Sequence, residues 1–115
     1  MKPRTCKKRL PAKARSPLAE CKRIIEGFLP DATVLLYGSQ ARGTATPESD
    51  YDLLVLTAMP LTSEEEDRIG DAVYDLEREQ GAVISLLFFA REQWDAPLYR
   101  LMPLHHEVER EGIVL

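Results

Sequence analysis

Two aspartates offer the clearest chemistry in this sequence. Asp50 and Asp52 lie two positions apart at the start of an apolar run, YDLLVLT at 51–57. Because a strand alternates its faces, both carboxylates are expected to point the same way, roughly 6–7 Å apart at Cα. Hard cations such as Mg²⁺ bind one or two carboxylates together with substrate phosphates, and two ions about 3.5–4 Å apart can clamp an in-line displacement at phosphorus. The pair therefore predicts a magnesium site.

A short glycine–serine turn could bind the phosphates. Gly38 and Ser39 directly follow the apolar run TVLLY at 33–37. Gly38 lets a ligand approach the backbone closely, and Ser39 offers a hydroxyl among the unpaired N–H groups of a helix start. Arg42 could fork onto phosphate oxygens, or it could be an ordinary surface ion-pair partner. A phosphate cradle on one strand end and a carboxylate pair on another predict a metal-nucleotide site.

The segment that joins these residues, VLLYGSQARGTATPESDYDLLVL at 34–56, resembles the signature of the DNA polymerase beta-like nucleotidyltransferase superfamily. It is especially similar to the minimal nucleotidyltransferases. The family pattern is Gly-Ser, ten residues and Asp-x-Asp, and the chain matches it without a gap at 38–39 and 50–52. The Ala-Arg-Gly that is usual after Gly-Ser stands at 41–43.

The resemblance implies roles for single residues and an activity. Gly38, Ser39 and Arg42 would bind the triphosphate, and Asp50 and Asp52 would coordinate Mg²⁺ and support catalysis. Family members transfer a nucleoside monophosphate from a triphosphate to a hydroxyl and release pyrophosphate. A domain this small has little room to bind an acceptor by itself, so a partner chain is expected to supply the target. The resemblance implies transfer of AMP from ATP by the antitoxin of a pair with a helical HEPN protein.

One departure from the family pattern concerns the third carboxylate of its catalytic members, on the next central strand. Ser85 falls at or near that position, and no Asp or Glu occurs from 82 to 90. A serine hydroxyl neither acts as a general base near neutral pH nor replaces a metal-binding charge. Glu79 and Glu92 are the nearest substitutes in sequence, or they are solvated surface acids. Slowed transfer is expected, and a catalytically impaired binding or regulatory module is the alternative interpretation.

The elements that must position these residues follow from hydrophobic spacing. Ser16 followed by Pro17 indicates a helix start, and Ser63 with Glu66 predicts a capping box for a helix that ends at Gly81. Strands are predicted over 33–37, 51–57 and 82–89, the last two apolar on both faces, a short turn over 91–94, and a final helix over 103–112. The order predicts an α/β (α+β) fold, a small mixed central sheet with helices packed on it.

Length and charge limit the remaining possibilities. The 115 residues suit one domain, predicted as a basic N-terminal arm over 1–15 and a nucleotidyltransferase domain over 16–115. The arm carries seven of the 15 Lys and Arg residues, and all 19 acidic residues lie after it. An acidic body argues against a broad nucleic-acid-binding face. Only the basic arm favours a third interpretation, modification of RNA ends.

Cysteine, histidine and apolar content exclude other classes of site. Cys6 and Cys21 are predicted to be free thiols. His105 and His106 are adjacent, so they make a poor chelate, and both are expected to face solvent. No apolar stretch is long enough to span a bilayer, and no apolar signal region follows the basic start. A cytoplasmic location without membrane contact is therefore expected.

Overall fold

The computed structural model describes residues 12–44 and 50–115. Most of the predicted basic arm, and part of the loop before Asp50, lie outside these residues. In chain order the elements are α1 (Ala12–Phe28), β1 (Thr33–Tyr37), α2 (Ser39–Arg42), β2 (Tyr51–Thr57), α3 (Ser63–Gln80), β3 (Ile84–Ala90), α4 (Arg91–Trp94), α5 (Pro97–Arg100), α6 (Pro103–Glu111) and β4 (Ile113–Val114). None of the described helices is long and apolar enough to cross a membrane.

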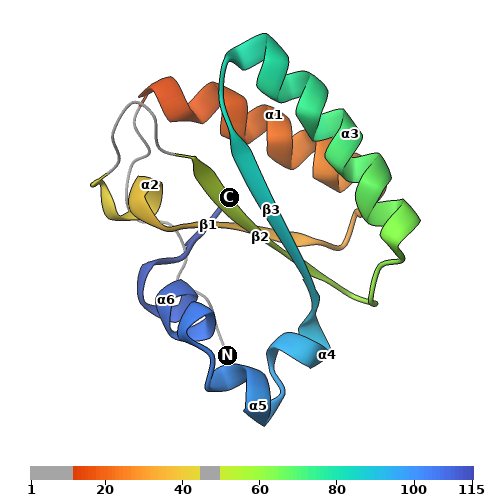
Figure 1. The fold of residues 1–115 in the computed structure, drawn as a ribbon, viewed down its shortest axis with the longest axis vertical. Helices are drawn as coiled ribbons and strands as arrows, with labels where there is room; N and C mark the ends of the chain where they lie inside the picture. Colours follow the sequence, from red (N-terminus) through yellow and green to blue (C-terminus); the bar gives the residue numbers. More distant parts are fainter. Residues whose placement is uncertain (1–11, 45–49) are drawn as a thin grey trace.

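One mixed sheet organises the described residues. Its strands lie in the order β3–β2–β1–β4 (Figure 1). β1 is antiparallel to both β2 and β4, whereas β2 and β3 are parallel and are joined through α3. Helices pack on this sheet, so the predicted α/β class with a small mixed sheet is confirmed. The parallel pairing brings the starts of β2 and β3 to the same end of the sheet, where Asp50 and Asp52 lie.

The two faces of the sheet are covered by different helices. Leu53 and Val55 pack in one apolar cluster with buried residues of α1 and α3. Leu54 and Leu56 pack in a second cluster, against Trp94 of α4 and residues of α6. Because side chains alternate along a strand, Asp52 shares its face with the second cluster. The carboxylate pair therefore lies on the face that α6 covers, and not on the face of α1 and α3.

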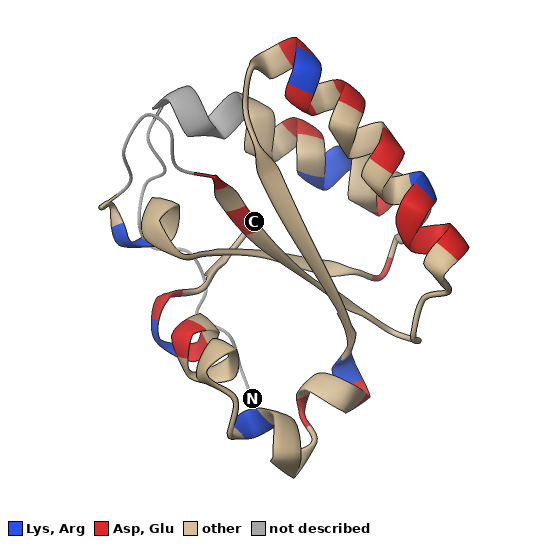
Figure 2. Cartoon of the chain, viewed as in Figure 1, with Lys and Arg blue, Asp and Glu red and all other residues tan. Residues whose placement is uncertain are grey.

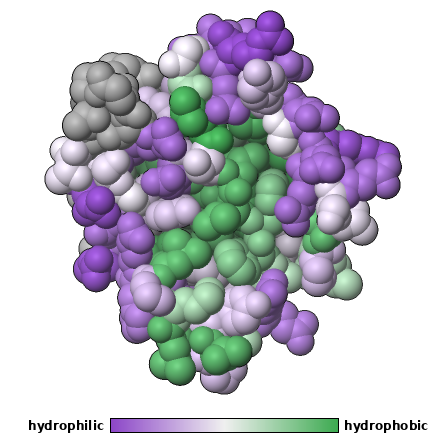
Figure 3. Space-filling view, viewed as in Figure 1, coloured by the Kyte–Doolittle hydropathy of each residue, from purple (hydrophilic) through white to green (hydrophobic). Residues whose placement is uncertain are grey.

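The third strand differs from the expectation of a strand covered on both faces. β3 is an edge strand, and Ser85 and Leu87, which share a face with Asp52, are both exposed. Figure 3 shows apolar surface in a hollow over the middle of the sheet, between α3 and the α4–α6 side. A run of apolar residues cannot distinguish a central strand from an edge strand whose outer face is open.

The long helices begin one or more residues away from their predicted starts. α1 begins at Ala12, and Pro17 lies inside the helix rather than at its first position. The capping box of α3 is formed by Thr62 and Glu65, one residue before the predicted pair. Both Thr62 and Ser63 are followed three residues later by glutamate, so the sequence pattern fits either position. The extended backbone of Thr62 decides between them.

The end of the chain is more structured than the sequence pattern indicates. The predicted turn at 91–94 is the one-turn helix α4, and α5 follows it without having been predicted. α6 starts at Pro103 and is followed by Gly112, as expected. The residues after it form β4, in which Ile113 and Val114 pair with β1. These pairings hold the C-terminal end of α6 beside β1, close to the candidate site.

Candidate functional site

The centre of the site is Asp52, which lies in register with one residue on each neighbouring strand. Tyr37 of β1 pairs with it on one side, and Ser85 of β3 pairs with it on the other. Directly paired residues project from the same face of a sheet, so these three side chains lie next to one another. Asp52 therefore lies between β1, which leads into the Gly38 turn, and β3, which carries Ser85.

The Gly38 turn is packed directly against the Asp52 carboxylate. Gly38 has a φ of 78° and a ψ of −159°, a backbone conformation that is essentially restricted to glycine. A Cβ at Gly38 would lie 2.5 Å from Oδ2 of Asp52. The carbonyl of Gly38 accepts the N–H groups of Ala41 and Arg42, both at 3.0 Å, and thereby starts α2. The turn and the carboxylate therefore share one location, as the metal-nucleotide interpretation requires.

The two aspartates have different environments. Asp50 is exposed just before β2, whereas Asp52 is half-buried within it. Burial raises the pKa of Asp52, and the charges of Asp50 and Glu107 raise it further, while Arg42 lowers it. Burial, followed by the charges of Asp52 and Glu107, raises the pKa of Tyr37 to about 12. The site is thus an electronegative position in which a cation would relieve repulsion between carboxylates.

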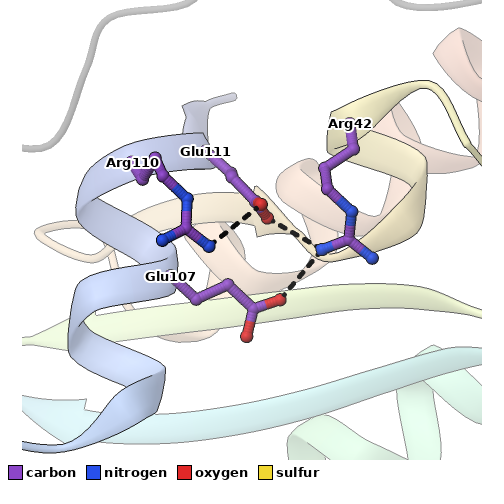
Figure 4. A network of polar contacts seen from close by, with 4 residues as sticks. All are labelled: Arg42, Glu107, Arg110 and Glu111. Atoms are coloured by element: carbon purple, nitrogen blue, oxygen red, sulfur yellow. Dashed lines mark hydrogen bonds and ion pairs between the residues drawn. The ribbon is translucent and has the colours of Figure 1, made fainter.

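Arg42 is held by two acids of α6 rather than facing an open cleft. Its Nη1 donates to Oε1 of Glu107 at 3.3 Å and to Oε2 of Glu111 at 2.9 Å (Figure 4). Arg110 contacts the other oxygen of Glu111 at 3.4 Å. Both glutamates project from α6 toward the guanidinium of Arg42. The side chain of Arg42 remains 42 % exposed. The structure thus places Arg42 in an ion-pair network, the second of the two roles considered from the sequence.

Sequence reasoning missed Glu107 and Glu111. Their spacing of four residues indicates one helix face, but nothing in the sequence indicates that this face meets α2. Figure 2 shows acidic positions both at the start of β2 and on α6 at the same end of the sheet. α6 and β2 are far apart in the chain, and only the packing of α6 beside β1, the neighbour of β2, brings the acids of α6 near the aspartates.

Comparison with known proteins identifies the family. The family model described as "Nucleotidyltransferase domain" matches residues 18–105. The chain belongs to the nucleotidyltransferase family. A protein of Haemophilus influenzae named "Probable protein adenylyltransferase MntA" is 38 % identical over 55 residues, and the alignment spans 48 % of each protein. The shared region is therefore about half of this relative's length.

Solved structures share the fold of this nucleotidyltransferase domain. One, named "putative minimal nucleotidyltransferase", is 27 % identical with a TM-score of 0.58, over 88 % of this chain and 94 % of that one. Another belongs to a complex of a tri-AMPylated HEPN toxin of Shewanella oneidensis with an MNT antitoxin. It is 16 % identical with a TM-score of 0.56, over 87 % of this chain and 69 % of that one. The predicted class, a minimal nucleotidyltransferase of the DNA polymerase beta-like superfamily, is confirmed.

The position of the missing third carboxylate is now defined by strand pairing. Ser85 lies directly beside Asp52 on β3, so no acid of that strand reaches the pair. Glu92 follows Ala90, at the opposite end of β3. Glu79 is exposed on α3, which covers the other face of the sheet. Neither of the two sequence neighbours can therefore replace the missing group.

The donor set at this end of the sheet fits a hard cation that phosphate or water completes. Two carboxylate ligands are what a Mg²⁺–nucleotide site requires of the protein. Within residues 12–44 and 50–115, no group of three His, Cys, Asp or Glu side chains is arranged to hold a metal ion. A cation at this site would thus depend on the phosphates, or on a rearranged carboxylate, for its remaining ligands.

His105 contradicts the expectation that both adjacent histidines face solvent. It is 1 % exposed and stacks on Trp94 with ring centroids 4.5 Å apart, whereas His106 is exposed. Neither ring nitrogen of His105 has a hydrogen-bond partner. Because burial disfavours the charged ring, the pKa of His105 is lowered. The histidine belongs to the apolar core beneath α6 and is not a metal ligand of the site.

Proposed function

We propose that this domain binds a nucleoside triphosphate together with Mg²⁺ and transfers its nucleoside monophosphate to a hydroxyl of a partner protein. ATP as donor and AMP as the transferred group are the preferred assignment. The observation that carries this proposal is the close approach of Gly38 to the Asp52 carboxylate. It means that phosphates cradled by the turn would lie next to the acids that bind their counter-ion.

Each residue of the site has a distinct role in this proposal. Asp50 and Asp52 hold the cation, which neutralises phosphate charge. Ser39, half-buried directly after Gly38, would offer its hydroxyl and backbone N–H to phosphate oxygens. Arg42 follows Ser39 by three residues and keeps part of its side chain exposed, so its guanidinium is proposed to bind phosphate oxygens. The chain thereby orients the triphosphate for in-line attack.

The transfer step forms one bond and breaks one. The acceptor oxygen bonds to the α-phosphorus, the bond from that phosphorus to the bridging oxygen breaks, and pyrophosphate leaves with those electrons. The proton of the acceptor hydroxyl must pass to a base. Ser85 cannot accept it near neutral pH, so transfer would lack a factor of about 10²–10⁴ that general-base catalysis supplies.

The partner is proposed to be a HEPN-type toxin, which this domain would neutralise as an antitoxin. Support comes from two relatives, the Haemophilus influenzae protein whose name describes a protein adenylyltransferase and the solved complex of an AMPylated HEPN toxin with an MNT antitoxin. The described residues form one sheet with its covering helices, so the acceptor is proposed to come from another protein.

Label transfer from ATP tests this proposal. The purified chain is incubated with Mg²⁺, ATP labelled at the α-phosphate and the product of a neighbouring HEPN gene. Label on the partner is expected with the wild type and is lost in Asp50→Asn/Asp52→Asn. Asp75→Asn, on the exposed surface of α3, is the matched control and retains transfer. Absence of label at every Mg²⁺ concentration contradicts transferase activity.

Ser85 beside Asp52 favours a second candidate function, a regulatory module that neutralises its partner by contact alone. In that case Asp50→Asn/Asp52→Asn would still bind and neutralise the partner, measured by a pull-down and by growth of toxin-expressing cells. Neutralisation that is lost together with the label, while the variant still binds its partner, would exclude the contact mechanism.

A further inference from the structure

The proposed cation site has a neutral residue, Ser85 of β3, where a third acid could lie beside Asp52. Asp50 and Asp52 are the acids of β2 and its approach, and Ser85 occupies the adjacent position on β3. Two carboxylates suffice for one Mg²⁺ ion bound with a nucleotide, whereas a second ion or a proton acceptor for the attacking hydroxyl would use a further acid. Among the described elements, α6 packs over this face of the sheet beside β1 and carries exposed or half-buried acids.

Glu107 is the acid of α6 that is placed to provide this charge. The neighbouring Val108 is fully buried in the cluster that α6 forms over this face of the sheet, which fixes the helix beside β1. Glu107 is one-third exposed, so its carboxylate can change rotamer without leaving a packed core. Its carboxylate contacts Arg42 at 3.3 Å, and Arg42 lies in the one-turn helix that starts at Gly38, the residue packed against the Asp52 carboxylate. Glu107 therefore lies over the same end of the sheet as the aspartate pair.

Arg42 connects the phosphate turn with this acid. Its guanidinium contacts Glu107 at 3.3 Å and Glu111 at 2.9 Å, and Glu111, with 11 % of its side chain exposed, also contacts Arg110. Glu107 is thus the more exposed and more distant of the two acids. Phosphate oxygens that approach Arg42 would compete first with Glu107. The displaced carboxylate would then add to the negative charge around the aspartate pair, which a bound cation relieves.

On the basis of the proposed function, we propose that Glu107 is the third carboxylate of this site. It exchanges Arg42 for the cation when a triphosphate binds the Arg42 guanidinium. Binding of phosphate and binding of metal are thereby coupled through Glu107. Phosphate that binds Arg42 releases Glu107 for the cation, and a cation that binds Glu107 releases Arg42 for phosphate. Glu111 keeps its contact with Arg110 and remains a positioning residue that holds Arg42 near the turn.

The test compares Glu107→Gln with Glu111→Gln, since both remove one partner of Arg42 and only Glu107 is placed to reach the cation. Calorimetry measures ATP affinity with and without Mg²⁺, and water-proton relaxation measures Mn²⁺ affinity in the presence of ATP. Glu107→Gln is expected to weaken Mn²⁺ binding about tenfold or more, as loss of a group that supports a metal does. Glu111→Gln is expected to change it by less than about threefold, because a partly exposed ion pair contributes little.

The metal-free measurement gives a second signature. Both variants are expected to bind ATP more tightly without metal, because Arg42 is less occupied and one negative charge is gone. Only Glu107→Gln loses the gain in ATP affinity that Mg²⁺ produces. Glu109→Gln, exposed on the same helix, replaces Glu111→Gln as control should the latter not fold.

The outcomes separate this inference from the function on which it rests. Equal Mg²⁺ dependence in Glu107→Gln and its control overturns the role of Glu107, while binding of Mg²⁺–ATP by the wild type leaves the proposed function standing. A wild type that shows no Mg²⁺–ATP binding, under conditions where denaturation curves show a folded chain, overturns both.

Discussion

Substitution of Gly38 by alanine tests the contact on which the candidate site depends. The backbone of Gly38 lies in a region that residues with a Cβ rarely occupy, and the added methyl group would meet Oδ2 of Asp52 at 2.5 Å. Two costs are therefore expected in the free energy of unfolding. The backbone strain costs about 1–3 kcal/mol, and forcing the Asp52 side chain off its rotamer costs about 0.5–1.5 kcal/mol. Gly38→Ala is thus expected to destabilise the domain by roughly 2–4 kcal/mol.

Gly43 in the same turn provides a matched control. Its φ of 80° is almost the same, but a Cβ there would meet nothing within 4 Å. Gly43→Ala is therefore expected to cost only the strain of a left-handed residue, about 1–2 kcal/mol. Urea denaturation measures both changes. Calorimetric titration with Mg²⁺–ATP should show that Gly38→Ala weakens binding about tenfold or more, whereas Gly43→Ala leaves binding largely intact.

A double-mutant cycle isolates the contact from the backbone strain. In the background Asp52→Ala the obstructing carboxylate is gone, so Gly38→Ala should cost about 0.5–1.5 kcal/mol less than it does in the wild type. A cost that is the same in both backgrounds, together with equal effects of Gly38→Ala and Gly43→Ala on nucleotide binding, would refute the shared location of turn and carboxylate.

Three further predictions concern the core and the helix caps. Burial lowers the pKa of His105, so the unfolded chain binds the proton more tightly than the folded one. The free energy of unfolding should therefore fall as the pH drops below the ordinary histidine value of 6.5, by at most about 1.4 kcal/mol per pH unit. His105→Phe, which retains an aromatic ring in the stack, should flatten this dependence in urea titrations between about pH 5 and about pH 8, and an unchanged slope would contradict the prediction. Thr62→Ala should cost about 1 kcal/mol through loss of the helix cap, whereas Ser63→Ala should stay within about 0.5 kcal/mol; the reverse order in denaturation midpoints would mean that the predicted cap is the true one. Burial, followed by the charge of Glu77, raises the pKa of the Cys21 thiol to about 12. In a Cys6→Ser background, Cys21 should therefore resist alkylation by iodoacetamide at about pH 8 until urea unfolds the chain. Rapid alkylation of the native protein would contradict this and show that the core around Cys21 opens.

The sequence by itself determined the local elements and the family, and it predicted the site residues. An apolar run that ends at Gly38 defines β1, and one that follows Asp50 defines β2, because local spacing is enough to mark a buried strand and the turn beside it. The spacing of Gly38-Ser39 and Asp50-Tyr51-Asp52 indicated the family, which the comparison confirmed. The position of Ser85 beside the aspartates also followed from aligning the third strand, and strand pairing agrees with it.

Tertiary structure decided what surrounds these residues. Glu107 and Glu111 meet Arg42 across more than sixty residues of chain, and no local pattern encodes which helix face packs beside which turn. The edge position of β3 and the burial of His105 depend in the same way on packing between elements. Side-chain spacing is a property of one element, whereas the charge and exposure of a site depend on contacts between elements, which form only when the chain folds.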